Sequence, residues 1–189
     1  MGEGGTVLYP SDTVYGLLCD ATSPEAVAGM ARLKGYTDLR PFIVLVDGME
    51  AARHLARLSH RALSLAETFW PGPLTLVLPA AEKAFPHVLS ESGEIALRLP
   101  ADPLSRRLLA ALGRPLASTS ANPVGSAHPH RVSDVDCGIL DGCVLVLDGG
   151  ELPHRSPSTV VRIRGGTMEL LREGAVPLGR LRGTAFGEF

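Results

Sequence analysis

The stretch Leu116-Ala117-Ser118-Thr119-Ser120-Ala121-Asn122 joins a short apolar run to a cluster of small hydroxyl and amide side chains. Residues 116–119 are typical of a buried strand, whereas the polar side chains at its end are poor core material. Each of them offers a short, directional hydrogen-bonding group that suits phosphate or carboxylate oxygens. The stretch therefore predicts a strand that carries an anion-binding turn at its end.

Two other polar segments also lie next to strand-like runs. Pro10-Ser11-Asp12-Thr13-Val14-Tyr15-Gly16 follows a strand predicted at residues 6–9, and a cationic cluster at residues 34–40 precedes the apolar run 42–46. Lys34 is one of only two lysines among 18 basic residues. It is either a helix-ending lysine favoured by the helix dipole or a ligand of an anion, and both interpretations stay open. Together, the three polar segments predict one site for an anionic ligand.

The composition indicates one globular domain with a substantial core. The chain has 189 residues, 45% of them hydrophobic, and a net charge of −2. Its bulk charge therefore argues for neither a nucleic-acid nor a membrane partner.

The three cysteines, Cys19, Cys137 and Cys143, are odd in number and lack metal-ligand spacing, which predicts free thiols in a reducing compartment. Because the sequence has no secretory leader and no apolar run of about 18 residues, we expect a cytoplasmic protein without a membrane contact.

Hydrophobic periodicity predicts a mixture of strands and helices. Strands are expected at residues 6–9, 42–46, 74–78, 94–99, 116–119, 143–147, 159–163 and 167–171, with a hairpin turn at Gly165-Gly166. Helices are expected from Ser23-Pro24 to Gly35 and at residues 49–58, 61–69 and 103–112. The order is not a regular βαβ series, so we predict an α/β fold with an open, twisted, mixed sheet. A single domain spans residues 1–182, and residues 183–189 form a C-terminal tail.

Several familiar catalytic arrangements are missing from the sequence. It has no Gly-x-Gly-x-x-Gly or Walker-type phosphate loop, and no Gly-x-Ser-x-Gly elbow surrounds Ser118 or Ser120. His128-Pro129-His130 and the nearby cysteines lack the spacing of a metal site and are typical of a surface loop at residues 123–133. Arg98 lies at the end of a strand predicted from alternating polar and apolar residues. The pattern fits two interpretations equally well: a structural arginine at the edge of the sheet, or an arginine with a role in function. The residues alone therefore predict an anion site without a protein-held metal.

Seven segments, taken in order, resemble the YrdC-type family of threonylcarbamoyl-AMP synthases. They are Tyr9-Pro10-Ser11-Asp12-Thr13-Val14-Tyr15-Gly16-Leu17, Leu33-Lys34-Gly35 with Arg40-Pro41-Phe42, Trp70-Pro71-Gly72-Pro73-Leu74-Thr75, Ala96-Leu97-Arg98-Leu99-Pro100, Ser118-Thr119-Ser120-Ala121-Asn122, Ser158-Thr159-Val160-Val161 and Leu171-Arg172-Glu173-Gly174. The resemblance implies the family's open twisted α/β sheet with a large basic cavity. It also implies that L-threonine, bicarbonate and ATP, with Mg²⁺ on the phosphates, give threonylcarbamoyl-adenylate and pyrophosphate. The product serves tRNA-modification proteins that form N6-threonylcarbamoyladenosine.

The resemblance implies a role for each matching position. L-threonine is expected at Thr13, Arg98, Ser118 and Ser158, with Arg98 pairing with the substrate carboxylate, a task that suits a planar guanidinium. ATP is expected at Lys34, Arg40, Ser120, Asn122, His128 and Arg172. Lys34 and Arg40 stabilise developing charge in this scheme. Neither a protein nucleophile nor a metal ligand from the protein is implied.

One position departs from the family pattern. Relatives usually read Lys-x-Arg-Pro in the cationic cluster, whereas this chain reads Lys34-Gly35-Tyr36-Thr37. Arg40 or Arg131 could reach the phosphates instead. The alternative to a synthase is a YrdC-like module without synthase activity that binds a nucleotide or makes an RNA contact. A third hypothesis is a carbamoyl-transfer relative like the YrdC-type domain of hydrogenase maturation proteins, which accompanies zinc-finger and acylphosphatase-like parts that this sequence does not contain.

Overall fold

The computed structural model of the chain describes residues 4–36, 41–153 and 156–184. Its strands are β1 (Thr6–Pro10), β2 (Tyr15–Asp20), β3 (Ile43–Leu45), β4 (Leu74–Pro79), β5 (Glu94–Arg98), β6 (Leu116–Ser120), β7 (Cys143–Val146), β8 (Thr159–Arg164) and β9 (Thr167–Arg172). Its α-helices are α1 (Pro24–Leu33), α2 (Met49–Leu55), α3 (His60–Phe69), α4 (Pro103–Leu112), α5 (Cys137–Asp141) and α6 (Leu178–Thr184), and two 3₁₀ helices are η1 (Pro86–Val88) and η2 (Val132–Asp134). Within these ranges, no helix is both long and apolar enough to cross a membrane.

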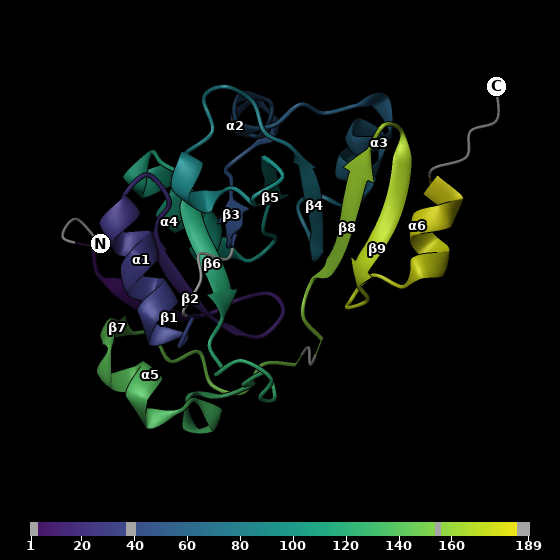
Figure 1. The fold of residues 1–189 in the computed structure, drawn as a ribbon. Helices are drawn as coiled ribbons and strands as arrows, with labels where there is room; N and C mark the ends of the chain where they lie inside the picture. Colours follow the sequence, from purple (N-terminus) through teal and green to yellow (C-terminus); the bar gives the residue numbers. More distant parts are fainter. Residues whose placement is uncertain (1–3, 37–40, 154–155, 185–189) are drawn as a thin grey trace.

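The nine strands of the described residues form one sheet in the order β7-β1-β2-β6-β3-β5-β4-β8-β9. β1 and β7, β3 and β5, and β4 and β8 pair in parallel, and the other neighbours are antiparallel. The outer strands β7 and β9 do not pair with each other, and Figure 1 shows the β8–β9 hairpin well separated from the β1–β2 side. The predicted α/β fold with an open mixed sheet is confirmed.

Helix α1 fixes the position of Lys34, which directly follows its last residue, Leu33. Ser23 caps the start of the helix, where its hydroxyl accepts a hydrogen bond of 3.1 Å from the Ala26 amide, and Pro24 occupies the first turn. Lys34 is the C-terminal cap, and Gly35 follows with φ of +72°, a left-handed conformation that glycine adopts without strain. The predicted helix and its stop at Gly35 are therefore confirmed.

The two faces of the sheet carry different apolar clusters. Neighbours such as Leu17 and Leu18 belong to different clusters, as the alternation of side chains along a strand requires. The larger cluster includes the buried faces of α1, α2 and α3, whereas the smaller one packs Leu109 of α4 against the sheet. On β6, Leu116 belongs to the smaller cluster. Because residues two apart share a face, Ser118 and Ser120 continue that same face.

The structure differs from the predicted elements at a few places. β2 was not predicted, because all six of its residues are buried and show no polar–apolar alternation. Helix α2 ends at Leu55 rather than at residue 58, since Ala56 is extended and bridges to Ala80. The short helix α5 was also missed. Helix α6 extends past residue 182 to Thr184 and contacts α3, and residues 185–189 of the expected tail lie outside the described residues.

The predicted turn at Gly165-Gly166 is confirmed. Both glycines have positive φ angles, of +55° and +80°, and they join β8 to β9 as an antiparallel hairpin. The loop predicted at residues 123–133 is also present up to Arg131, where η2 follows.

Candidate active site

A cavity of about 330 Å³ opens on the sheet face that carries Ser118 and Ser120. Its polar lining residues include Ser11, Thr13, Arg98, Ser118, Thr119, Ser120, Ser158 and Arg172, and apolar residues such as Ile43, Val77 and Val160 lie between them. Both charged residues among its described lining are arginines, and this part of the lining includes no carboxylate. The cavity therefore suits an anionic or carboxylate-bearing ligand.

Arg98, at the end of β5, is held by three fixed partners. Its Nε donates to the carbonyl oxygen of Gly72 at 3.0 Å, its Nη1 donates to the Thr13 hydroxyl at 3.4 Å, and its Nη2 pairs with the Asp12 carboxylate. The other Asp12 oxygen accepts from the Ala101 amide at 3.2 Å. These hydrogen bonds fix the position of the guanidinium. Arg98 is only 5% exposed, so little water reaches it. One N–H on each terminal nitrogen has no partner among the described residues.

The turn that carries Thr13 is organised by Ser11. The Ser11 hydroxyl donates to the Val14 carbonyl oxygen at 2.6 Å and accepts from the Thr13 and Val14 amides at 3.1 and 3.2 Å. It also lies 2.9 Å from the Thr13 hydroxyl. Such local side-chain bonds replace sheet pairing where β1 turns into β2. They hold the Thr13 hydroxyl beside Arg98 at the cavity wall.

Arg172, near the end of β9, binds the segment that carries Ser158. Its Nε and Nη2 donate to the Ser158 carbonyl oxygen at 3.1 and 2.9 Å, and Nη2 also donates to the Ser158 hydroxyl at 3.1 Å. The same hydroxyl lies 2.9 Å from that of Thr75 on β4. Burial, and then the charge of Arg98, lower the pKa of Arg172 from its ordinary value. Both arginines line the same cavity, and the charge of Arg98 disfavours the protonated form of Arg172.

Lys34 lies behind the turn that follows β6. Its Nζ donates to the Ser120 carbonyl oxygen at 2.7 Å and to the Asn122 carbonyl oxygen, with the Asn122 side-chain oxygen 3.5 Å away. Lys34 is only 5% exposed, and burial lowers the pKa of its amine to about 8. At neutral pH the amine is still largely protonated, so a positive charge is held beneath the polar turn.

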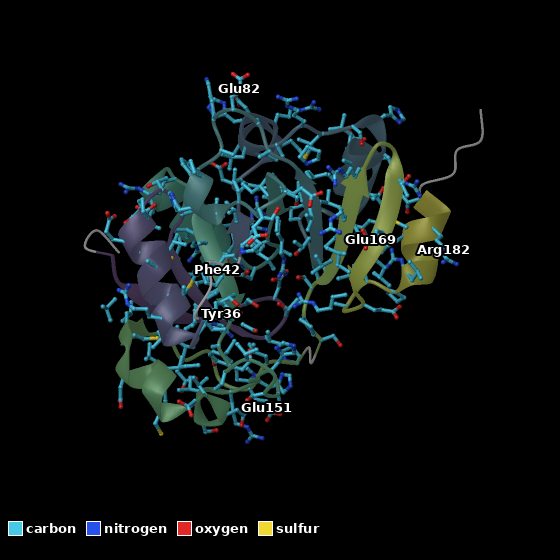
Figure 2. All side chains as sticks on the ribbon, in the orientation of Figure 1. Tyr36, Phe42, Glu82, Glu151, Glu169 and Arg182 are labelled. Atoms are coloured by element: carbon cyan, nitrogen blue, oxygen red, sulfur yellow. The ribbon has the colours of Figure 1, made fainter. Side chains whose placement is uncertain are left out.

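Tyr36 forms an aromatic part of the cavity wall. Its ring centroid is 5.9 Å from that of Phe42, with an angle of 34° between the planes, and Figure 2 shows the two labelled residues beside each other. Phe42 is buried, whereas Tyr36 is half-buried. Both residues line the cavity. At this position the wall therefore presents an aromatic ring and not a guanidinium.

The loop at residues 123–133, which carries His128 and His130, is held beside the cavity. The Tyr15 amide donates to the Pro129 carbonyl oxygen at 3.0 Å, which holds the loop beside the start of β2. Among the described residues, no three His, Cys, Asp or Glu side chains are grouped as a metal would require. The three cysteines are free, with Cys19 buried and Cys137 exposed.

A family model described as "Telomere recombination", which covers Sua5, YciO and YrdC proteins, matches residues 1–174. The chain belongs to the Sua5/YciO/YrdC family. It is 36% identical over 181 residues to the threonylcarbamoyl-AMP synthase of Pyrococcus abyssi, covering 93% of this chain and 52% of that protein. It is 37% identical over 134 residues to the synthase of Halorhodospira halophila, with 70% of each chain covered. The chain thus spans about half the length of the Pyrococcus relative.

Solved structures of the Sua5/YciO/YrdC family show the same fold. The crystal structure of P. abyssi Sua5 complexed with L-threonine superposes with a TM-score of 0.87 at 32% identity, covering 96% of this chain and 54% of that one. Escherichia coli YciO superposes with a TM-score of 0.84 at 26% identity, covering 94% of this chain and 86% of that one.

The cavity gathers most of the site residues predicted from the sequence. Thr13, Arg98, Ser118, Ser120, Ser158 and Arg172 line it. Lys34 and Asn122 are not lining residues and lie behind the wall, with Asn122 donating from its side-chain nitrogen to the Ser126 carbonyl oxygen at 2.6 Å. His128 is half-buried in the adjoining loop, and Arg40 lies outside the described residues.

Sequence reasoning missed several residues that position this Sua5/YciO/YrdC-type site. Asp12 pairs with Arg98, Thr75 contacts Ser158, and the Tyr9 hydroxyl lies 3.3 Å from that of Ser118. Asp12 stood inside a polar segment that was already singled out, so the signal for it was present. Tyr9 and Thr75 stand at the ends of two of the segments that resemble the family, but each has the pattern of an ordinary strand residue, so neither was assigned a role.

Proposed function

We propose that this chain forms threonylcarbamoyl-adenylate and pyrophosphate from L-threonine, bicarbonate and ATP. The observation that carries the proposal is a single cavity where hydroxyl groups and two guanidinium groups meet, with no carboxylate in its described lining. The reactants bring a carboxylate, a bicarbonate and a triphosphate, for which such groups are suitable partners. The names of the relatives, and the threonine complex of P. abyssi Sua5, add support.

L-threonine is assigned to the Arg98 side of the cavity. Arg98 retains one N–H on each terminal nitrogen for a substrate carboxylate, and Thr13 lies beside it. The hydroxyls of Ser118 and Ser158 supply further polar contacts. Because Asp12 and Gly72 already orient the guanidinium, little conformational freedom remains to be lost when the substrate binds.

ATP is assigned to the side formed by Ser120 and Arg172. The Ser120 hydroxyl and the turn behind it face the phosphates, with the Lys34 charge beneath and Asn122 holding the turn. Arg172 supplies a second cation, and Arg40 and His128 remain predicted ATP contacts. These groups neutralise the charge that moves onto the leaving pyrophosphate.

The proposed chemistry requires no protein nucleophile. The unprotonated threonine amine attacks carbon dioxide formed from bicarbonate, giving an N-carboxylate after loss of one proton. A carboxylate oxygen then attacks the α-phosphorus of ATP, and the bond between that phosphorus and the α,β-bridging oxygen breaks to release pyrophosphate. Overall, threonine, bicarbonate and ATP give threonylcarbamoyl-adenylate, pyrophosphate and water. The protein contributes position and charge stabilisation.

The described lining of the cavity does not offer a fitting site for Mg²⁺. Divalent cations of this type prefer carboxylate and other oxygen ligands, and no carboxylate is in the described lining of the cavity. The Asp12 carboxylate is occupied by Arg98 and the Ala101 amide. We therefore assign any Mg²⁺ to the phosphate oxygens of the nucleotide.

In a cell, the product would serve the tRNA-modification proteins that form N6-threonylcarbamoyladenosine. The product is a mixed anhydride and is prone to hydrolysis, so its use by a nearby acceptor enzyme is chemically reasonable. We place this reaction in the cytoplasm, where its substrates and tRNA are present.

The proposal is tested by pyrophosphate release with each substrate omitted in turn. Release that requires L-threonine, bicarbonate and ATP together is expected. Release that persists without threonine or bicarbonate would indicate simple ATP hydrolysis, and no release with all three present would contradict synthase activity.

Tyr36 favours a second candidate, a family module that binds a nucleotide or RNA without synthase activity. By the resemblance described above, an arginine is expected in the cationic cluster at the position where this chain has Tyr36. Saturable RNA binding that survives the double change Lys34→Ala and Ser120→Ala, together with no pyrophosphate release, is the result that this alternative predicts.

A further inference from the structure

A row of apolar side chains crosses the floor of the cavity. Ile43 on β3, Ala96 on β5 and Val77 on β4 are direct neighbours in the register of the sheet, and all three line the cavity. Ser118 on β6 pairs with Ile43, so a hydroxyl group stands at one end of the row. We call Ile43, Ala96 and Val77 the apolar strip. It gives the cavity floor a continuous apolar surface over three adjacent strands.

Packing inside the protein does not use up the apolar strip. The next residues along β4 and β5, Leu76 and Leu97, leave the opposite face of the sheet and belong to the larger apolar cluster. On the face of the strip, Leu45 is buried in the smaller cluster that includes α4, whereas Ile43 and Val77 are only half-buried. Apolar surface that stays open inside a cavity suits an apolar part of a ligand.

Ala96 makes a recess in the middle of the apolar strip. Its side chain is a single methyl group, whereas Ile43 and Val77 on either side are branched at Cβ and extend further from the sheet. Adjacent strands lie about 4.8 Å apart, so the backbones of these two neighbours are separated by about 10 Å. Their side chains occupy part of that width. The space that remains above Ala96 therefore suits a small apolar group such as a methyl, and not a purine ring lying flat.

The recess shares a strand with the arginine that faces the amino-acid substrate. Arg98 follows Ala96 by two residues on β5, so the two side chains leave the same face of the sheet about 7 Å apart along the strand. The hydroxyl of Thr13 lies beside the guanidinium at 3.4 Å, and that of Ser118 stands at the end of the row. A small amino acid whose carboxylate binds Arg98 therefore has hydroxyl partners and an apolar recess within reach of its side chain.

We propose that Ala96, between Ile43 and Val77, is a specificity-determining residue whose recess takes the side-chain methyl group of the amino-acid substrate. The identification of that substrate as L-threonine rests on the proposed function. L-serine lacks the methyl group, and in L-allo-threonine the methyl and hydroxyl groups exchange places. A methyl group in an apolar pocket contributes about tenfold or more to selectivity. L-threonine should therefore bind about tenfold more tightly than either analogue.

The test is calorimetric titration with L-threonine, L-serine and L-allo-threonine, in the absence of ATP and bicarbonate. Ala96→Val fills the recess with two additional methyl groups. Threonine affinity should then fall about tenfold while serine affinity changes little, so that the ratio of the two affinities approaches one. Ala111→Val, at an exposed position on α4, is the matched control and should keep both affinities.

Val77→Thr tests the same recess with almost no change in shape. The substitution replaces one methyl group of the apolar strip with a hydroxyl group, so the ratio of threonine to serine affinity should fall in the same direction. Val144→Thr is the control, because Val144 lies on the edge strand β7 and is 66% exposed. Thermal unfolding of all four variants shows whether each is folded before its affinities are compared.

Three results would overturn the proposal. They are equal losses of threonine and serine affinity in Ala96→Val, a threonine-to-serine ratio that neither Ala96→Val nor Val77→Thr changes, and no binding of any of the three amino acids. Loss of ATP affinity with an unchanged ratio would assign the apolar strip to the nucleobase instead. Because these are binding measurements, they are independent of pyrophosphate release: absence of release contradicts the synthase, whereas an unchanged ratio contradicts the role of the recess alone.

Discussion

The Nζ of Lys34 lies 2.7 Å from the Ser120 carbonyl oxygen, joining the end of α1 to the turn that follows β6. The two residues are far apart in sequence, so this contact depends on the complete fold. It places a buried positive charge directly behind the polar turn, with the Asn122 carbonyl oxygen as a second acceptor. A single lysine therefore both closes the helix and supports the candidate anion site.

Replacing Lys34 should destabilise the protein as well as weaken anion binding. Lys34→Met leaves the Ser120 and Asn122 carbonyl oxygens without their donor, which typically costs about 1–3 kcal/mol. Urea unfolding measures this loss. Lys83→Met is the matched control, because Lys83 is the other lysine of the chain and is exposed. Equal stability of the two variants would contradict the role given to Lys34.

The lowered pKa of Lys34 predicts how stability changes with pH. Burial lowers this pKa to about 8 in the folded protein, whereas an unfolded lysine keeps its proton to about pH 10.4. Between these values the unfolded chain binds more protons, so this residue makes the free energy of unfolding rise with pH. Burial raises the pKa of both Cys19 and Tyr9 to about 12, and these groups act in the opposite sense at high pH.

Comparison with Lys34→Met isolates the lysine from Cys19 and Tyr9, since both proteins contain them. The free energy of unfolding of the unmodified chain minus that of the variant should increase between pH 8 and about pH 9.5. Chemical denaturation across this range provides the measurement. A difference that stays flat or decreases would show that the folded-state pKa of Lys34 is not lowered.

Arg98→Lys should selectively weaken threonine binding. Lysine keeps the charge but cannot contact Gly72, Thr13, Asp12 and a substrate carboxylate with one planar group. We expect L-threonine affinity to fall about 10- to 100-fold, the equivalent of about 1.5–3 kcal/mol. ATP affinity should change much less. Calorimetric titration with each substrate distinguishes these effects, and Arg106→Lys on the exposed side of α4 is the control. Equal losses for both substrates would argue against a threonine-specific role.

Gly174 does not line the cavity, but Gly174→Ala should displace Pro157 and Ser158, which do. A Cβ at this position would lie 2.2 Å from the Pro157 carbonyl oxygen and 2.8 Å from that of Ser158, which are backbone atoms that cannot move independently. The displaced Ser158 should then lose its contacts with Thr75 and Arg172. Gly179→Ala is the control, because its Cβ meets no atom within 4 Å. Thermal unfolding and substrate titration should show losses only for Gly174→Ala, and normal binding in that variant would contradict this picture.

Tyr36→Arg tests the departure from the family pattern. An arginine at this point of the cavity wall should strengthen ATP binding about tenfold by adding a charge-assisted contact. The gain should shrink as salt concentration rises, whereas Tyr36→Phe should leave ATP affinity almost unchanged. Weaker ATP binding by Tyr36→Arg would show that the tyrosine ring itself contributes to nucleotide binding.

The sequence predicted the parts of this molecule that depend on local patterns. Ser23-Pro24, Gly35 and the Gly165-Gly166 turn carry local conformational signals, and the structure confirms the elements that they bound. β2 was hidden because a strand buried on both faces has no alternation. The Arg98–Asp12 and Lys34–Ser120 contacts join distant segments, so no local pattern could reveal them. The resemblance to a family identified most of the cavity residues, but not the partners that hold them.

The most direct test of the proposed reaction is mass spectrometry of the nucleotide products formed from ¹³C-bicarbonate, L-threonine and ATP. The proposed reaction predicts an adenylate that contains both threonine and one ¹³C atom, formed together with pyrophosphate. The label should be absent when threonine is omitted. Binding of threonine and ATP without any ¹³C-labelled adenylate would contradict the synthase and support a module that binds these ligands without joining them.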